Sequence, residues 1–203
     1  MMMHAKNYDH LLGNLEGMSD ALLKAHFGLY QGYVNKTNEI EKKLQDLSSK
    51  DSNYSYSEYS ELQRRRAVPF NGARLHELFF ENLTGQKVEV SPELQTAIEQ
   101  SYGSIRSYLE DVQAGLLSAH GWLLLCRSQR DGVLRNLVIE EHHRGLLVEQ
   151  DILLALDGWE HAYAMDYGTA KVHYIDALLA RIHWDVVDQR FQASAGRFIT
   201  QAA

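Results

Sequence analysis

The sequence predicts an α+β protein in which a helical N-terminal half meets a C-terminal half that contains a small antiparallel sheet. Apolar residues recur at helical spacing over 19–83, whereas three short apolar runs within 122–156 have the lengths of strands. Asp131-Gly132 separates the first two runs, and this dipeptide is a strong hairpin signal. We expect an N-terminal helical hairpin domain over 1–88, packed on a C-terminal α/β domain over 89–203 with a three-stranded antiparallel sheet.

Two long helices joined by a polar turn are predicted in the N-terminal half. Ser19 is suited to cap the first helix, whose apolar stripe continues to Leu47. The polar turn covers 48–53, and the second helix runs over about 56–83. Pro69 should break or kink this second helix, because proline lacks the amide hydrogen that a helix interior needs.

The C-terminal half is predicted to hold two shorter helices, three strands and a final helix. Ser91-Pro92 suits the start of a helix, because proline is favoured at the first helical position. Beyond Gly121 the apolar residues form short runs bounded by turn residues, which is typical of strands. The helices are expected at 93–102, 104–118 and 171–190, and the strands at 122–129, 133–141 and 152–156.

Composition excludes several classes of protein. The 203 residues carry a net charge of −7, so a general nucleic-acid binder is not expected. No apolar stretch approaches the roughly 20 residues that cross a membrane. The single cysteine, Cys126, cannot form an intramolecular disulfide and suits a reducing compartment. The N-terminus lacks the apolar core of a signal peptide, so we expect a cytoplasmic protein.

The most informative motif is Asp157-Gly158-Trp159-Glu160-His161, which follows the apolar run 152–156. A carboxylate at the end of a buried segment is costly unless its charge is compensated, and a bound cation does this well. An aspartate that caps a helix bearing a core histidine is the alternative. His26 and His76 lie on the apolar stripes of the two predicted hairpin helices. Three imidazoles and one carboxylate would suit iron, manganese or zinc.

These residues lie in segments that resemble the iron/manganese superoxide dismutases, in the same order along the chain. The C-terminal segments carry the more specific match and the N-terminal segments support it. The matching segments are Leu156-Asp157-Gly158-Trp159-Glu160-His161-Ala162-Tyr163, Asp166-Tyr167-Gly168, His183-Trp184-Asp185-Val186-Val187, Ala97-Ile98 through Tyr102-Gly103-Ser104, Gly121-Trp122, His26 to Tyr33-Val34-Asn35, and Phe70-Asn71 through Leu75-His76 and Phe79-Phe80.

The resemblance implies one iron or manganese ion per subunit, held between the two domains by His26, His76, Asp157 and His161. In this family the metal alternates between its +3 and +2 states, oxidising one superoxide to O2 and reducing the next to H2O2. Glu160 matches the residue that reaches the partner's metal-bound histidine, so a homodimer or a tetramer is expected. The alternatives are a noncatalytic metal-binding or structural relative and an oxygenase with two histidines and one carboxylate.

The first helix departs from the usual pattern of the family. Usual members place the gateway tyrosine eight residues after the first ligand, whereas His26 and Tyr33 are seven apart. At 100° per residue, seven steps return almost to the same helix face and eight pass it by about 80°. We therefore expect a regular helix here with Tyr33 near the metal. Tyr30, one turn after His26, is the competing gateway candidate.

Tyr30 is also part of a second difference from the usual pattern of the family. The family often pairs a histidine near this position with a tyrosine at the position of Ala164, across the dimer interface. A large residue at one position and a small one at the other suggest volume compensation, with Tyr30 approaching Ala164 of the partner.

A third departure concerns the residue that contacts the metal-bound solvent. Many members use a glutamine, but its position on the second helix is Gly72 here. His142 aligns with a histidine found in some relatives, so we expect it to contact this solvent and tune the metal. His143 is the competing candidate, and two surface histidines in a charged loop are the plainer interpretation.

Overall fold

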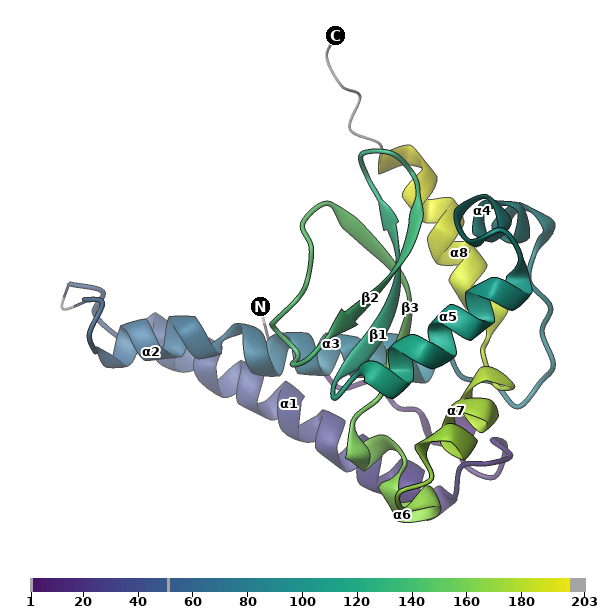
Figure 1. Cartoon of the computed structure of the whole chain (residues 1–203). Helices are drawn as coiled ribbons and strands as arrows, with labels where there is room; N and C mark the ends of the chain where they lie inside the picture. The colour runs from purple at the N-terminus through teal and green to yellow at the C-terminus, as the bar shows by residue number, and fades with distance from the viewer. Residues whose placement is uncertain (1, 51, 198–203) are drawn as a thin grey trace, which may run out of the picture.

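The computed structural model describes residues 2–50 and 52–197, and the N-terminal part is helical as predicted (Figure 1). Asp51, part of the predicted polar turn, lies outside the described residues. Helix α1 runs side by side with α2 and α3, forming the helical hairpin. The bounds are η1 (Asp9–Leu11), α1 (Asp20–Asp46), α2 (Glu58–Arg65) and α3 (Ala67–Glu81).

Local chemistry explains where the hairpin helices begin. The Ser19 hydroxyl accepts a hydrogen bond from the Leu22 amide at 3.1 Å, and α1 is α-helical throughout, which confirms both expectations for this helix. The second helix is interrupted at Arg66 rather than at Pro69. Pro69 lies in the first turn of α3, where an amide has no partner within the helix, so proline is tolerated there without a kink.

The C-terminal part contains the expected three-stranded antiparallel sheet, in the order β2-β1-β3. Strand β3 begins at Gln150, two residues before the predicted start, because Gln150 still pairs with Ser128 of β1. The elements are α4 (Pro92–Tyr102), α5 (Ile105–Ser118), β1 (Trp122–Ser128), β2 (Leu134–Ile139) and β3 (Gln150–Asp157).

The prediction of one final helix over 171–190 is wrong, because residues 180–183 separate two helices. There Ile182 forms a β-bridge with Leu83, and the His183 amide donates to the carbonyl of Asn82 at 2.7 Å. This pairing with the end of α3 replaces the helical hydrogen bonds. The last elements are η2 (Glu160–Ala162), α6 (Ala164–Tyr167), α7 (Lys171–Leu179), α8 (Trp184–Ser194) and η3 (Ala195–Arg197).

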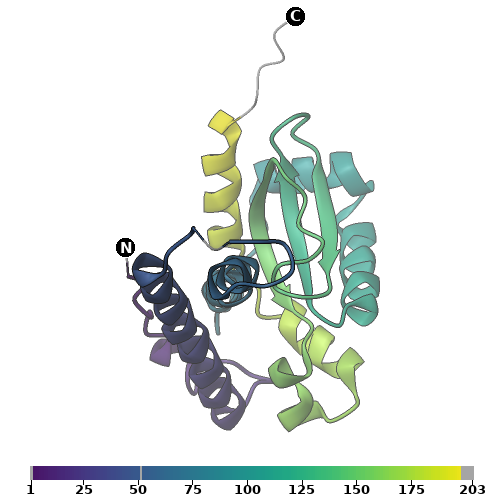
Figure 2. The same ribbon diagram turned by 90° about the vertical axis from the view of Figure 1, so that its left-hand side faces the viewer.

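The elements form layers that bring the hairpin onto the sheet (Figure 2). Helices α3 and α8 pack on β3, whereas α4 and α5 pack against the sheet from the β2 side. Strand β3 runs from this core to the junction with the hairpin and ends at Asp157, which is fully buried. Among the described residues, no helix combines the length and the apolar character needed to cross a membrane.

Candidate metal centre

Four side chains meet between the hairpin and the sheet. They come from α1 (His26), α3 (His76), the end of β3 (Asp157) and η2 (His161), and one ligand atom from each lies within 4.8 Å of all the others. The Nε2 atoms of His26, His161 and His76 lie 3.2, 3.1 and 3.8 Å from Asp157 Oδ2. The side chains of His26, His76 and Asp157 are buried, and that of His161 is 30% exposed.

Hydrogen bonds to its side chain and to its backbone carbonyl hold Asp157 in place. The Trp159 amide donates to Oδ1 at 2.9 Å, and the Tyr174 hydroxyl donates to the Asp157 carbonyl at 2.7 Å. Oδ2 is thereby left facing the imidazoles. Gly158 permits the tight turn that follows, because a Cβ there would lie 2.8 Å from the Gly121 carbonyl oxygen.

His76 has a ring nitrogen that protein groups leave unsatisfied. Its Nδ1 lies 2.6 Å from the Gly72 carbonyl, which can only accept, so Nδ1 carries the hydrogen. Nε2 then presents a lone pair, and this buried atom has no hydrogen-bond partner among the described residues. A buried polar atom without a partner is costly, and a metal ion would satisfy this one.

The geometry of the cluster fits one transition-metal ion. Bonds of about 2.0–2.2 Å from one ion to nitrogen and oxygen place neighbouring ligand atoms about 3–3.7 Å apart. The distances of 3.1 and 3.2 Å to Asp157 Oδ2 fall within this spacing, and the third, 3.8 Å from His76, lies just beyond it. Three imidazole nitrogens and one carboxylate oxygen suit iron, manganese or zinc.

Burial keeps His26 and His76 neutral, and hydrogen bonds keep Asp157 ionised, as metal binding requires. It lowers the pKa of His26, and it lowers that of His76 to about 3, so both imidazoles are neutral at pH 7. Burial alone would raise the pKa of Asp157, but hydrogen bonds from His161 and His26 outweigh it and hold the pKa below its ordinary value. The carboxylate is therefore ionised.

The apoprotein should lose stability as the pH falls below 6.5. The unfolded chain then protonates both histidines, whereas the folded apoprotein keeps His76 neutral down to about pH 3 and His26 neutral below its ordinary pKa. The unfolded state therefore binds more protons, and the free energy of unfolding should fall by up to about 1.4 kcal/mol per pH unit for each histidine. Urea unfolding of the apoprotein at pH 7, 6 and 5 measures this slope. A constant free energy across that series would contradict the expectation.

Comparison with known proteins places the chain in a family. Residues 90–190 match the family described as iron/manganese superoxide dismutases, C-terminal domain. The chain is 38% identical over 190 residues to a superoxide dismutase named for iron from Aquifex pyrophilus, covering 91% of this chain and 89% of that protein. A second, from Aquifex aeolicus, is 37% identical with the same coverage. One named for manganese, from Halobacterium salinarum, is 31% identical over 89% of this chain and 90% of its own. The chain belongs to the iron/manganese superoxide dismutases.

In this superoxide dismutase, Tyr33 and His142 lie together beside the four candidate ligands. The Tyr33 hydroxyl is 2.7 Å from His142 Nε2, and the Tyr33 ring centroid is 5.3 Å from that of His76. The Trp122 indole, which can only donate, bonds to His142 Nδ1 at 3.0 Å. A neutral His142 therefore carries its hydrogen on Nε2 and donates it to the Tyr33 oxygen. The Tyr33 hydrogen is left for another acceptor.

His143 lies outside this arrangement. Its side chain is 19% exposed and its Nδ1 is 3.5 Å from Glu141 Oε2, in the loop that joins β2 to β3. His142, in contrast, is 5% exposed, and its carbonyl accepts a hydrogen bond from the Asn71 side chain at 2.9 Å. Of the two candidates, the structure brings His142 to the cluster.

Gly72 leaves room for Tyr33. A Cβ at Gly72 would lie 2.9–3.1 Å from three atoms of the Tyr33 ring. A glutamine at this position would therefore collide with Tyr33 where it lies. The short spacing from His26 to Tyr33 and the glycine at 72 are thus compatible parts of one arrangement.

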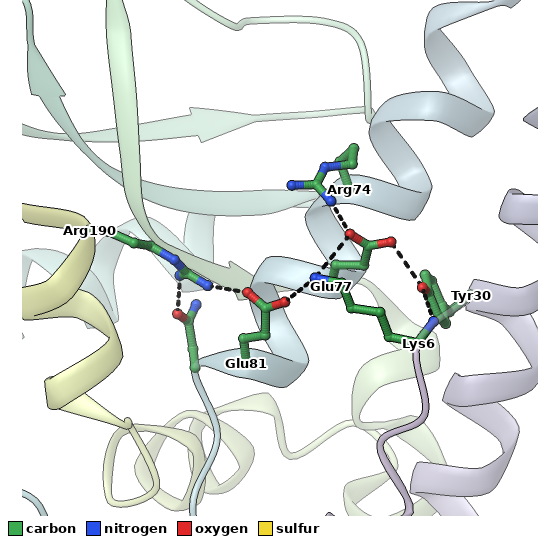
Figure 3. A network of polar contacts seen from close by, with 7 residues as sticks. Lys6, Tyr30, Arg74, Glu77, Glu81 and Arg190 are labelled. Atoms are coloured by element: carbon green, nitrogen blue, oxygen red, sulfur yellow. Dashed lines mark hydrogen bonds and ion pairs between the residues drawn. The ribbon is translucent and has the colours of Figure 1, made fainter. Parts of the chain in front are cut away.

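Tyr30 lies elsewhere. It is 2% exposed, and its hydroxyl donates to Glu77 Oε1 at 2.9 Å rather than facing the candidate ligands (Figure 3). Because its side chain is enclosed by its own chain, it has no surface to offer to the partner's Ala164. This burial weighs against volume compensation between the two positions, which stays a prediction.

Sequence reasoning did not assign two residues that hold the site. Trp122 sets the hydrogen-bonding state of His142, and Tyr174 anchors the backbone of Asp157. Tyr174 occurs in the apolar stripe of a predicted helix, and Trp122 starts a predicted strand. Their hydrogen bonds to His142 and Asp157 join residues that are 20 and 17 positions apart in the sequence, and no local pattern reveals such pairs.

Proposed function

We infer that this chain disproportionates superoxide to O2 and H2O2 with one iron or manganese ion held by His26, His76, Asp157 and His161. The observation that carries this is the buried cluster of three imidazoles and one carboxylate, with the lone pair of His76 Nε2 unsatisfied by protein. Relatives named for iron and for manganese support both metals. When bound, the ion would supply the two redox states through which one superoxide is oxidised to O2 and the next, with two protons, is reduced to H2O2.

Reloading the metal-free protein tests this function. Superoxide removal should be absent from the apoprotein and should return on loading with iron, with manganese or with either. Protein that holds one ion per chain without removing superoxide would instead be a noncatalytic metal-binding relative. Oxygen-dependent turnover of an organic substrate would indicate an oxygenase.

Tyr33 is proposed as the gateway residue that donates hydrogen bonds to incoming superoxide and the nascent peroxide. Burial, followed by the negative charge of Asp157, raises its pKa above 10.0, so the hydroxyl remains protonated at neutral pH. His142 Nε2 donates a hydrogen bond to the Tyr33 oxygen, so the hydrogen of the Tyr33 hydroxyl points away from His142. We propose that His142 acts on the metal centre by this route, through the hydroxyl of Tyr33.

Replacing His142 by Ala should lower the rate of superoxide removal by roughly tenfold and alter its pH profile. The substitution frees the Tyr33 oxygen and leaves the buried indole hydrogen of Trp122 without an acceptor. Rates should be measured from pH 6 to 10 on protein loaded separately with iron and with manganese. His143→Ala is the matched control in the same loop and should retain the original profile. An unchanged profile in His142→Ala would exclude a tuning role.

We further propose that the chain acts in the cytoplasm as at least a homodimer, in which Glu160 contacts His161 of the partner. Glu160 is exposed, and the neighbouring His161 is the candidate ligand that reaches the surface. A lone buried cysteine, Cys126, suits a reducing compartment. Light scattering on metal-loaded protein should give the mass of a dimer or a tetramer, and a monomer would contradict the role of Glu160.

A further inference from the structure

A polar cluster lies between the two helices that carry His26 and His76, apart from the metal centre (Figure 3). It connects the segment before α1 (residues 2–19, here called the arm) with helices α1, α3 and α8. Its charged and hydroxyl groups are not explained by the metal site. The Glu77 cluster, as we call it, consists of Lys6, Tyr30, Arg74, Glu77, Glu81 and Arg190.

Tyr30 and Glu77 form the centre of the cluster. The Tyr30 hydroxyl donates to Glu77 Oε1 at 2.9 Å and accepts from the backbone amide of Lys6 at 2.9 Å. The second carboxylate oxygen of Glu77 pairs with Arg74 and lies 3.7 Å from Lys6 Nζ. Because the Glu77 side chain is only 3% exposed, water does little to replace these partners.

The rim of the cluster ties further segments to α3. Lys6 Nζ donates to one oxygen of Glu81 at 2.7 Å, and Arg190 of α8 donates to the other at 2.8 Å. Farther along the arm, the main chain of Met3 exchanges two hydrogen bonds of 2.8 Å with the Asn38 side chain of α1. The arm is thereby fixed to both helices of the hairpin.

The Glu77 cluster and two of the candidate metal ligands lie on neighbouring positions of the same two helices. Tyr30 lies one turn after His26 on α1, and Glu77 directly follows His76 on α3. The Phe80 ring packs against both sets, with centroids 5.0 Å from His26, 6.0 Å from His76 and 5.9 Å from Tyr30. A rotation or slide of α1 against α3 would therefore disturb the cluster and the ligands together.

A buried carboxylate makes this helix contact specific. Apolar side chains can repack after a small slide, but Glu77 is satisfied only where Tyr30 and its cations meet it. We propose that Glu77 and Tyr30 are positioning residues for the metal centre, whose buried hydrogen bond, closed by Lys6 of the arm, fixes the separation of His26 and His76. This role rests on the metal centre proposed above.

Tyr30→Phe tests the proposal because it removes the hydroxyl and keeps the ring. Hydrogen bonds to charged groups change equilibria by about ten- to a hundredfold. We therefore expect the full-length, metal-loaded variant to release its ion to an excess chelator about tenfold faster. The electron paramagnetic resonance spectrum of the bound ion should also change, because the ligand positions shift. A global loss of stability alone would leave that spectrum unaltered.

Tyr8→Phe is the matched control. The Tyr8 ring lies 5.9 Å from that of Tyr30, and its buried hydroxyl has no hydrogen-bond partner among the described residues. Release and spectrum should therefore match those of the unsubstituted protein. Glu77→Gln is a second test variant, which keeps the size of the side chain and removes its charge. It should also accelerate release of the ion.

The outcomes separate the positioning role from the function itself. Faster release and an altered spectrum in Tyr30→Phe or Glu77→Gln, with Tyr8→Phe unchanged, support the proposal. If the unsubstituted protein holds its ion and removes superoxide while both test variants match Tyr8→Phe, the positioning role is overturned and the function stands. If the unsubstituted protein takes up neither iron nor manganese, both are overturned.

Discussion

Replacing Asp157 by Asn should deprive the protein of its metal and of superoxide removal together. Asp157 is the one anionic group in the cluster, and its Oδ2 is the atom around which the three imidazoles gather. A neutral amide would remove the charge that compensates the cation at a largely buried site. Groups that merely support ligands contribute about 10–100-fold to metal affinity, so loss of this ligand should cost more than a hundredfold.

Metal content after dialysis against a chelator, measured with the rate of superoxide removal, checks this prediction. Asp176→Asn is a suitable control, because Asp176 is exposed on α7 and lies outside the cluster. Circular dichroism should show that the Asp157→Asn apoprotein remains folded, since the amide keeps the shape of the side chain. One ion per chain and an unchanged rate in Asp157→Asn would contradict the assignment of this residue as a ligand.

The candidate metal ligands could be proposed from the sequence because their signals are local and because the segments that carry them resemble the iron/manganese superoxide dismutases. His26 and His76 occupy apolar stripes with helical period, and Asp157 ends an apolar strand that is followed four residues later by His161. The hairpin signal between the first two strands and the cap at Ser19 are likewise read within a few residues. Each of these features stabilises its own element, and packing the elements then brings the ligands together.

The sequence was insufficient where distant segments decide the local structure. Helical periodicity continues through residues 180–183, but pairing of Ile182 with Leu83 ends α7 there. Tyr30 shares a helix stripe with His26, yet Glu77 draws its hydroxyl away from the metal centre. The sequence places both residues on their helices, but only the packed structure shows that a carboxylate of α3 faces Tyr30. The same limit applies to Trp122, whose indole sets the hydrogen of His142.

Tyr33→Phe should keep the metal and lower the maximal rate of superoxide removal by about ten- to a hundredfold. Tyr33 is not among the four candidate ligands, so its loss leaves the metal-binding atoms in place. The substitution removes the hydroxyl that His142 orients, and positioned proton donors contribute about 10²–10⁴-fold to rates. The lower value is expected because water can replace a half-buried hydroxyl in part.

The pH profile gives this prediction its sharpest test. The hydroxyl can donate only while it is protonated, and its pKa lies above 10.0, so activity that depends on it should decline only in strongly alkaline solution. Tyr33→Phe should lack this alkaline decline, whereas Tyr8→Phe should retain it at the original rate. Metal content measured on the same samples excludes loss of the ion as the cause. If Tyr33→Phe holds its ion and keeps both the maximal rate and the alkaline decline, the Tyr33 hydroxyl is not the proton donor.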